Sequence, residues 1–398
     1  MFGFGETFWT GDRYWHPGVA NDSPSAIRTY PMPCAATWSH LLAEVDAAAG
    51  VGKTRSVAIH RAGVATSLIA AFGAADVRAS NLVDSAHFVA GEITGIKTST
   101  AGAPAFDDWR HSVICEPDID GLIPFFGAAW SSPAGWAIFV GINGGEASAG
   151  GGHTEIRAQT IVPVPGKFKH FYGYSEGGAV PAGNALTYAF RLNGVPTALN
   201  LAFAPGDTLV SDVVTEVPVV AGDLVNIILT QTAGAWTGHI THGICFIPDD
   251  PSYYWLSRPF NFDGLLLGAA VEYSLPTCGK IHTGDHWNAV ERPTRWPSGP
   301  DIRGLYVRLG AAPGVGATRT FTVRVNGVDT PITLTIAGAA TTDYATGLVE
   351  PGDWDSVTIS TAATGAPAAS GGSFALYGTD RVVTVTAVVP ASAERGTK

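Results

Sequence analysis

The sequence has little charge and no long apolar run. Of its 398 residues only 14% are charged, with 23 Lys and Arg against 34 Asp and Glu, and the formal net charge is −11. Binding to nucleic acid phosphates needs clustered Lys and Arg, so this balance argues against nucleic acid as a partner. No apolar run approaches the roughly 18 residues that a transmembrane helix needs, so no membrane insertion is expected.

Cysteine pairs and an export signal are also missing. The chain has four cysteines, none of them in a Cys-x-x-Cys pair, at Cys34, Cys115, Cys245 and Cys278. We expect buried thiols here in preference to disulfides or metal ligands. The opening MFGFGETFW lacks the basic and continuous apolar segments of a secretory signal, so we expect synthesis in the cytoplasm without export by that route.

In place of these features the chain has 49 glycines, 26 prolines and one pattern that occurs three times. The clearest copy covers residues 186–249, and related copies begin at residues 54 and 319. Glycines recur in two turns of this pattern with a period near 131 residues: Gly63, Gly194 and Gly327, then Gly91, Gly222 and Gly352. Solenoid repeats are much shorter, so we predict three copies of one whole domain, at residues 1–118, 119–249 and 250–398.

Each copy is predicted to be β-structure. Apolar residues alternate with polar ones on both sides of a turn such as Asn326-Gly327, which is typical of a hairpin. The predicted inward-facing residues are Tyr188, Phe190, Leu199, Leu201, Ile227 and Leu229 in the second copy and Val323, Val325, Leu334, Ile336, Val357 and Ile359 in the third. The one helical candidate, residues 38–50, falls where the other copies have strands, so a strand is favoured. The prediction is an all-β chain of three tandem antiparallel β-sandwich domains, jelly-roll-like and tightly packed because their connections are short.

Two stretches match catalytic motifs by eye. Residues 47–54 (AAAGVGKT) fit a relaxed phosphate-loop pattern, but the third copy has Ala317 where the first has Lys53. A structural turn is therefore favoured. The stretch GYSEG puts Ser175 at the centre of a nucleophile-elbow pattern, which must be followed by a helix. The residues that follow are rich in glycine and proline, so a turn is favoured again.

The histidines also favour structural roles. Two of them recur at equivalent positions, with serine expected in the third copy: His111, His242 and Ser373. A second group could begin a metal site: His282, Asp285 and His286. A catalytic zinc needs a third protein ligand, and the sequence indicates none. We therefore predict no metal, no cofactor and no catalytic residues.

Two polar-aromatic clusters lie outside the repeated pattern. One comprises Trp9, Asp12, Arg13, Tyr14, Trp15 and His16. The other comprises His286, Trp287, Arg292, Arg295 and Trp296. Aromatic rings with neighbouring polar groups can anchor a protein interface, stack on sugars or cover the end of a sandwich. The sequence leaves these three readings open.

The repeated pattern resembles β-sandwich modules of tailed-bacteriophage virion proteins, namely tail-fibre, receptor-binding and capsid-decoration subunits. The matching segments are Gly166-Lys167, 188–199 and 221–227, with counterparts at Gly279-Lys280, 321–330 and 351–357. The first copy departs most, with Ala62 in place of the turn asparagine and Glu92 in place of the corner aspartate.

The resemblance implies a non-enzymatic structural protein of a bacteriophage virion, in the tail, a fibre or the capsid decoration, that mediates assembly or attachment. Its expected partners are other virion proteins, with a host-surface glycan left open, and it would be assembled in the host cytoplasm. Two alternatives stay open: a carbohydrate-binding or depolymerising tail protein, and a secreted bacterial surface or adhesion protein.

Overall fold

The computed structural model describes residues 2–5, 13–15, 29–45, 47–102, 109–129, 137–143, 155–176, 178–233, 238–260, 272–274, 294–296, 301–352, 354–367 and 372–379. Strands make up all of the regular structure in these ranges except one 3-10 turn, η1 (Glu155–Arg157). Within the described ranges no helix is long and apolar enough to cross a membrane. The all-β prediction is therefore confirmed.

Among the described residues the strands form six antiparallel sheets, which we group in pairs as sandwiches 1, 2 and 3. Sandwich 1 has one sheet in the order β1 (Phe2–Gly5), β9 (Trp109–Pro117), β4 (Ala36–Val45) and β7 (Arg78–Phe88). Its other sheet has the order β2 (Arg13–Trp15), β8 (Ile93–Ala101), β5 (Thr54–Arg61) and β6 (Val64–Phe72), with β3 (Tyr30–Pro31) paired to β8.

Sandwich 2 repeats this order. Its first sheet is β10 (Ile123–Ala129), β19 (His239–Pro248), β13 (Gly166–Glu176) and β16 (Leu209–Asp212), with β17 (Val217–Val219) also on β13. Its second sheet is β11 (Ala137–Val140), β18 (Leu224–Ala233), β14 (Ala185–Leu192) and β15 (Val195–Phe203), with β12 (Thr160–Ile161) paired to β18.

Sandwich 3 follows the same plan. Its first sheet is β20 (Tyr253–Phe260), β28 (Gly372–Thr379), β23 (Asp301–Leu309) and β26 (Thr342–Val349). Its second sheet is β21 (Glu272–Ser274), β27 (Ser356–Thr364), β24 (Gly314–Val325) and β25 (Val328–Gly338), with β22 (Thr294–Arg295) paired to β27.

The strand order is that of a jelly roll. When the short strands β3, β12, β17 and β22 are set aside, every sandwich has eight strands in the described part of the chain. One sheet takes them in the order first, eighth, third and sixth, and the other in the order second, seventh, fourth and fifth. Two four-stranded sheets connected in this way are the double Greek key of jelly rolls.

Three apolar clusters fill the sandwiches. Alternation along the strands predicted their members correctly: Tyr188, Phe190, Leu199, Leu201, Ile227 and Leu229 are buried in sandwich 2, and Val323, Leu334, Ile336, Val357 and Ile359 in sandwich 3. Val325 is only partly buried, at the end of β24. The segment that could have been a helix forms β4, as favoured from the sequence.

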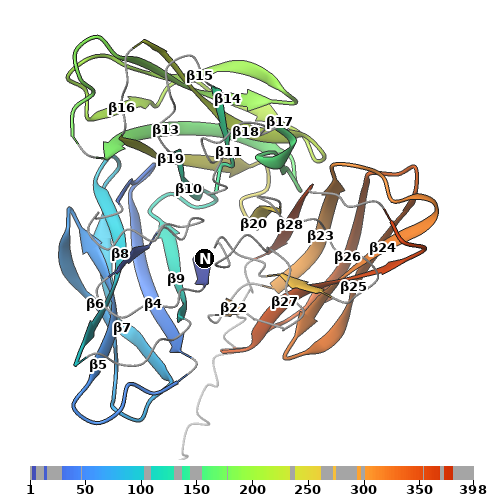
Figure 1. Ribbon diagram of the computed structural model, residues 1–398, viewed down its shortest axis with the longest axis horizontal. Helices are drawn as coiled ribbons and strands as arrows, with labels where there is room; N and C mark the ends of the chain where they lie inside the picture. Colours follow the sequence, from blue (N-terminus) through green and yellow to red (C-terminus); the bar gives the residue numbers. More distant parts are fainter. Residues whose placement is uncertain are drawn as a thin grey trace, which may run out of the picture.

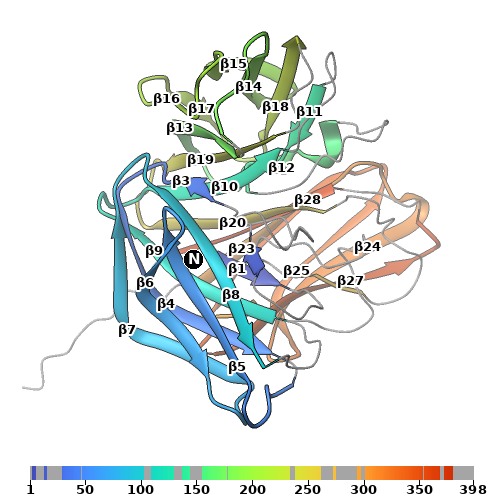
Figure 2. The ribbon, with the colours of Figure 1, turned by 60° about the vertical axis from the view of Figure 1, so that its left-hand side comes forward.

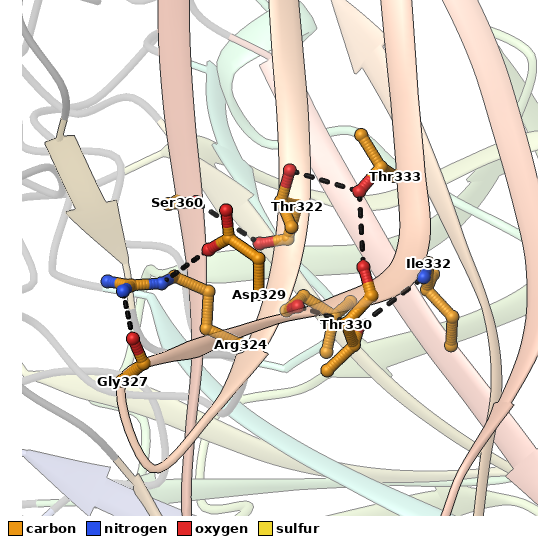
Figure 3. Close-up of polar contacts among 9 residues, drawn as sticks. Thr322, Arg324, Gly327, Asp329, Thr330, Ile332, Thr333 and Ser360 are labelled. Atoms are coloured by element: carbon orange, nitrogen blue, oxygen red, sulfur yellow. Dashed lines mark hydrogen bonds and ion pairs between the residues drawn. The ribbon is translucent and has the colours of Figure 1, made fainter.

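The hairpin turns have the conformation that their sequence predicts. Both central residues of each turn have positive φ: Ala62 and Gly63, Asn193 and Gly194, and Asn326 and Gly327. This backbone matches the twist of the flanking strands. Close to the turn in sandwich 3, Arg324 donates to Asp329 at 2.8 Å and to the carbonyl of Gly327 (Figure 3).

A threonine braces the strand after each turn. Thr330 donates from Oγ1 to the carbonyl of Val323 at 2.7 Å and accepts from the backbone N–H of Ile332 at 3.3 Å (Figure 3). Thr66 and Thr197 make the same two contacts in the other sandwiches. The carbonyl that accepts belongs to the residue where strand pairing shifts register, so the threonine satisfies a group that the ladder leaves free.

The three sandwiches are arranged around a common centre (Figure 1). Sandwich 1 is blue, sandwich 2 is green and sandwich 3 is orange (Figures 1 and 2). Strands of each sandwich contact strands of the other two. Strand β1 contacts both β9 of its own sandwich and β22 of sandwich 3. The tight packing expected from the short connections is therefore present.

Candidate functional site

In each sandwich a short strand pairs with the start of a long strand, and we call this place the corner. The short strands are β3, β12 and β22, and their partners are β8, β18 and β27. One residue of positive φ lies at each corner: Gly91 (80°), Gly222 (93°) and Trp354 (64°). Its backbone N–H donates, over 2.8 or 2.9 Å, to the carbonyl of the residue that follows the short strand: Met32, Val162 or Trp296. The three corners are therefore the same structure.

The third corner corrects a prediction from the sequence. The spacing of the glycines put Gly352 there, but the residue with positive φ is Trp354. Asp355 accepts from the N–H of Gly352 at 2.6 Å, as Asp223 accepts from the N–H of Val220 at 2.8 Å. The corner of the third copy therefore lies two residues further along the chain than the glycine spacing predicted. Left-handed backbone costs a side-chain-bearing residue about 1–2 kcal/mol, which the surrounding contacts must offset.

An asparagine ties the hairpin turn to the corner in two sandwiches. Asn193 donates to Asp223 at 2.8 Å and accepts from the N–H of Leu224 at 2.9 Å. Asn326 and Asp355 form the same pair at 2.7 Å. We call each pair a clasp. It holds two chain reversals together, so that the corner keeps one position.

In sandwich 1 the turn has no asparagine, and an ion pair stabilises the corner instead. Ala62 occupies the turn, and Glu92 replaces the aspartate. Glu92 accepts from the N–H of Val89 at 3.1 Å and forms an ion pair with Arg61 at 2.9 Å. Because the longer Glu92 side chain reaches Arg61, the corner is secured without the amide.

The corner of sandwich 1 lies against sandwich 2. Strand β3 contacts β13 and β19. The fit allows no side chain at Gly243 of β19, because an added Cβ would overlap the carbonyl of Pro31 and come within 2.8 Å of Pro33. An added Cβ on Gly91 would meet the ring of Tyr172 at 3.3 Å. At the same junction, the N–H of Thr29 donates to the buried carboxylate of Glu176 at 2.5 Å.

The corner of sandwich 2 lies against sandwich 3 in the same way. Strand β12 contacts β20, β23 and β28. Arg308 of β23 donates to the side-chain carbonyl of the buried Gln159 at 2.8 Å. An added Cβ on Gly222 would lie 4.0 Å from the hydroxyl of Tyr306.

The first strand of a sandwich also places an aromatic ring in the apolar cluster of the preceding one. Phe126 on β10 belongs to the cluster of sandwich 1, edge-on to Trp38 with ring centroids 6.1 Å apart. Trp255 on β20 belongs to the cluster of sandwich 2, edge-on to Phe125 at 4.8 Å. Edge-on aromatic pairs of this kind contribute about 0.5–1.5 kcal/mol beyond the area that they bury.

The corner of sandwich 3 returns to sandwich 1. Strand β22 contacts β1 and β9. The guanidinium of Arg78 on β7 lies over the ring of Trp354 at 5.6 Å, a cation–π contact. Arg78 also pairs with Glu44 at 3.2 Å.

The three junctions form a closed cycle: each corner contacts the next sandwich, and the third corner contacts the first. Contacts between unlike surfaces close into a ring when their rotations add up to a full turn. Here a single chain supplies all three members of the ring. No protein-family model matches the chain, and no curated protein sequence matches it significantly.

Most of the predicted site residues lie outside the described residues or are described by their backbone alone. Five of them lie outside the described residues: Trp9, His16, His286, Trp287 and Arg292. Arg13 and Trp15 lie in β2, and Arg295 lies in β22, with only the backbone described.

The structure corrects the prediction for Trp296. It was a candidate for contact with a partner or a glycan, but its side chain is 0% exposed in the cluster of sandwich 3. Its ring lies edge-on to Tyr254 with centroids 6.3 Å apart, and its backbone completes the corner. Its role is packing, because the chain itself already covers it.

The motifs that resemble catalytic ones have structural roles. Residues 47–53 connect β4 to β5, so no helix follows the loop, and Gly50 donates to the carbonyl of Ala74 at 2.9 Å. Arg55, buried at 2% exposure, donates to the carbonyl of Ala47. Ser175 is 0% exposed within β13 and donates to the carbonyl of Gly178 at 2.7 Å. A buried, engaged hydroxyl in a strand is not a nucleophile elbow.

The recurring histidines are buried, and burial lowers the pKa of both His111 and His242 to about 3. His242 hydrogen bonds with the hydroxyl of Tyr188 at 2.6 Å and donates to the carbonyl of Ile142 at 3.0 Å. In sandwich 3 the inward-facing counterpart is Phe374, not the predicted Ser373, because Phe374 joins the core cluster while its neighbour Ala375 faces sandwich 2.

The metal candidates and the cysteines have different outcomes. His282, Asp285 and His286 lie outside the described residues, and in the described part no three His, Cys, Asp or Glu side chains gather as ligands. Three cysteines are buried free thiols, as predicted: Cys34, Cys115 and Cys245. Cys278 lies outside the described residues.

Sequence reasoning missed the residues that build the junctions. Gly243 carried a signal, since a glycine inside a strand often marks the close approach of another backbone. Gln159, Glu176 and Arg308 carried none, because each looks like an ordinary surface residue until the next sandwich is placed against it.

Proposed function

We propose that the chain is a non-enzymatic structural protein of a bacteriophage particle, assembled in the host cytoplasm with other virion proteins. The observation that carries the proposal is the closed ring of three jelly rolls in one chain. Jelly rolls are a common architecture of viral shells as well as of lectins. A chain that closes its own ring offers neighbours a preformed three-part block, which suits a tail or decoration subunit.

Two further features support a structural role. The catalytic-looking serine and lysine segments are part of strands and turns, and Ser175 and both recurring histidines are buried. The junctions use buried polar groups such as Glu176 and Gln159, which fix the relative position of the sandwiches. Satisfied polar groups of this kind contribute specificity of arrangement more than net stability.

The proposal is tested by locating the chain in particles. Phage particles from a strain that encodes this chain would be purified by density gradient, and their proteins would be quantified by mass spectrometry. We expect the chain at a fixed, integral ratio to the major capsid or tail protein. Recovery of the chain only outside the particle fraction would overturn the proposal.

One observation favours the carbohydrate-binding alternative. Tyr306 and Tyr344, partners across β23 and β26, stack with ring centroids 5.2 Å apart and an interplanar angle of 17°. Tyr344 is 58% exposed, so one ring face is open beside the junction with sandwich 2. Exposed tyrosine faces of this kind can stack on sugar rings.

This alternative has its own experiment. The purified chain would be applied to a glycan array, together with Tyr344→Ala and the control Leu348→Ala, an exposed residue on the same strand. Binding that is lost in Tyr344→Ala and kept in Leu348→Ala would establish the site. Absence of binding by the unmodified chain would remove the alternative.

A further inference from the structure

Three cysteines gather where sandwich 1 meets sandwich 2. Cys34 directly follows Pro33, which lies against β19, and Cys245 is part of β19. Cys115 comes from β9 of sandwich 1. All three belong to the one apolar cluster that spans this junction, and none of them is in a disulfide.

Two of these thiols come from different sandwiches and face each other. Cys245 and Gly243 lie on the same face of β19, because alternate residues of a strand share a face. That face carries Pro31 and Pro33 of sandwich 1, so Cys245 points toward the segment that holds Cys34. Cys34 and Cys245 are both buried in the apolar cluster at this junction.

We propose that Cys34 and Cys245 are a redox modification site, which closes to a disulfide between sandwiches 1 and 2 when a peroxide reaches the junction. Hydrogen peroxide converts the Cys34 thiol to a sulfenic acid, and one water leaves. The Cys245 sulfur then attacks the Cys34 sulfur, the S–S bond forms, and the hydroxyl leaves as a second water. Two thiols lose two electrons and two protons, and one peroxide is reduced to two waters.

The order of the two steps follows from exposure. Cys34 is 6% exposed, whereas Cys245 is 0% exposed, so the oxidant meets Cys34 first. Burial, and then the neighbouring Cys34, raises the pKa of Cys245 well above its usual value. Cys245 is therefore a protonated thiol, which reacts slowly with peroxide itself. When its sulfur attacks the Cys34 sulfenic acid, its proton leaves with the hydroxyl as water.

The disulfide would lock one junction of the ring covalently. It would close a loop from residue 34 to residue 245, and long loops lose the most unfolded-state freedom on cross-linking. A chain made in a reducing cytoplasm and released into an oxidising medium would acquire the lock after assembly. Only this timing depends on the proposed phage role, because the pairing itself depends on the junction.

The experiment uses the reduced, full-length chain. It is treated with stoichiometric hydrogen peroxide, its remaining thiols are blocked with N-ethylmaleimide in denaturant, and its peptides are mapped by mass spectrometry. We expect one dominant cross-linked pair, Cys34 with Cys245, and an intact mass lower by two hydrogens. We also expect the midpoint of urea unfolding to rise and to return after dithiothreitol.

Matched variants distinguish the Cys34–Cys245 disulfide from unspecific oxidation of the chain. Cys34→Val copies Val164, which occupies the equivalent place after β12, and should abolish both the cross-link and the shift in the urea midpoint. Cys115→Ala should preserve both. Cross-links that involve Cys115 or Cys278, overoxidised Cys34 without a cross-link, or no reaction at all would each overturn the proposal, and mapping of the unmodified chain decides this even if a variant fails to fold.

Discussion

His111 and His242 are buried without charge, and this couples the stability of the fold to pH. Their pKa is lowered to about 3 by burial, whereas an unfolded histidine titrates near 6.5. Below pH ~6.5 the unfolded chain takes up protons that the folded chain cannot, until the pH nears the folded value. Stability is therefore lost as the pH falls, by about 2 kcal/mol per histidine at pH 5.

The test compares urea unfolding at pH 7 and pH 5. His111→Gln removes one titrating group, so its difference in stability between the two pH values should be smaller than that of the unmodified chain by about 2 kcal/mol. The readout is the difference between pH values, so a general loss of stability in the variant does not disturb it. An unchanged difference would contradict the burial of a neutral histidine.

Leu334 tests the core of sandwich 3. Its side chain is 4% exposed within the apolar cluster, so Leu334→Ala should lower the free energy of unfolding by about 2–5 kcal/mol. Val328 lies on the same strand and is 68% exposed, so Val328→Ala should change it by less than about 0.5 kcal/mol. Chemical denaturation of both variants gives the comparison, and equal effects would rule out the burial of Leu334 in the core.

At the residue scale, alternation predicted which side chains face inward because one rule governs a whole strand. Counting residues from one copy to the next failed where the spacing between copies is not constant. Gly352 and Ser373 were placed by counting from the second copy, but the third copy runs two residues later at its corner and one residue later on β28. Such shifts are invisible without the hydrogen bonds that define them.

At the scale of elements, the first hairpin is the one that its sequence suits least. Ala62 has a φ of 47°, where alanine is strained and asparagine is tolerated. Ala62→Asn should therefore raise the free energy of unfolding, by at most the roughly 1–2 kcal/mol that left-handed backbone costs. Thermal or urea unfolding measures this, and Asn193→Ala, which creates the converse change and loses the clasp, should lower it by a larger amount. Stabilisation by Asn193→Ala would refute the clasp.

The long strands were predictable and the short ones were not. Strand β4 was placed correctly because the other two copies show strands at its position, although its own sequence also suits a helix. Strands β3, β12 and β22 have two residues each, which is too short for any period. They are strands only because a long strand lies beside them, and their partners are more than 60 residues away along the chain.

At the scale of the whole molecule, the fit at Gly243 decides whether the ring stays closed. Gly243→Ala would place a methyl group against Pro31 and Pro33 of sandwich 1, so sandwich 1 should separate from sandwich 2. Small-angle X-ray scattering should then show a larger radius of gyration and a longer maximum dimension. Both changes follow because two separated sandwiches extend further than two that are packed together.

Gly173→Ala is the matched control. An added Cβ there would come within 2.8 Å of Leu201 and Phe203, both inside sandwich 2. This variant should lose stability to urea while its scattering profile stays that of the closed ring. Equal expansion of both variants, or of neither, would show that the junction does not depend on Gly243.

The short connections between copies predicted that the sandwiches pack together, but not the order of their contacts. Glu176, Gln159 and Arg308 become junction residues only through a rotation between sandwiches that no local pattern encodes. The candidate clusters drawn from aromatic residues were placed by composition alone, and the one member whose side chain is described, Trp296, is part of a core.

The last junction has a consequence for synthesis on the ribosome. The face of sandwich 1 formed by β1 and β9 waits for β22, which is made some 180 residues after β9 ends. At translation rates of about 5–20 residues per second, that face stays open for roughly 10–35 s. During this interval β22 of a neighbouring nascent chain can dock there instead. Polysomes that make this chain densely would therefore yield interlocked dimers, and slower initiation would favour the ring closed within one molecule.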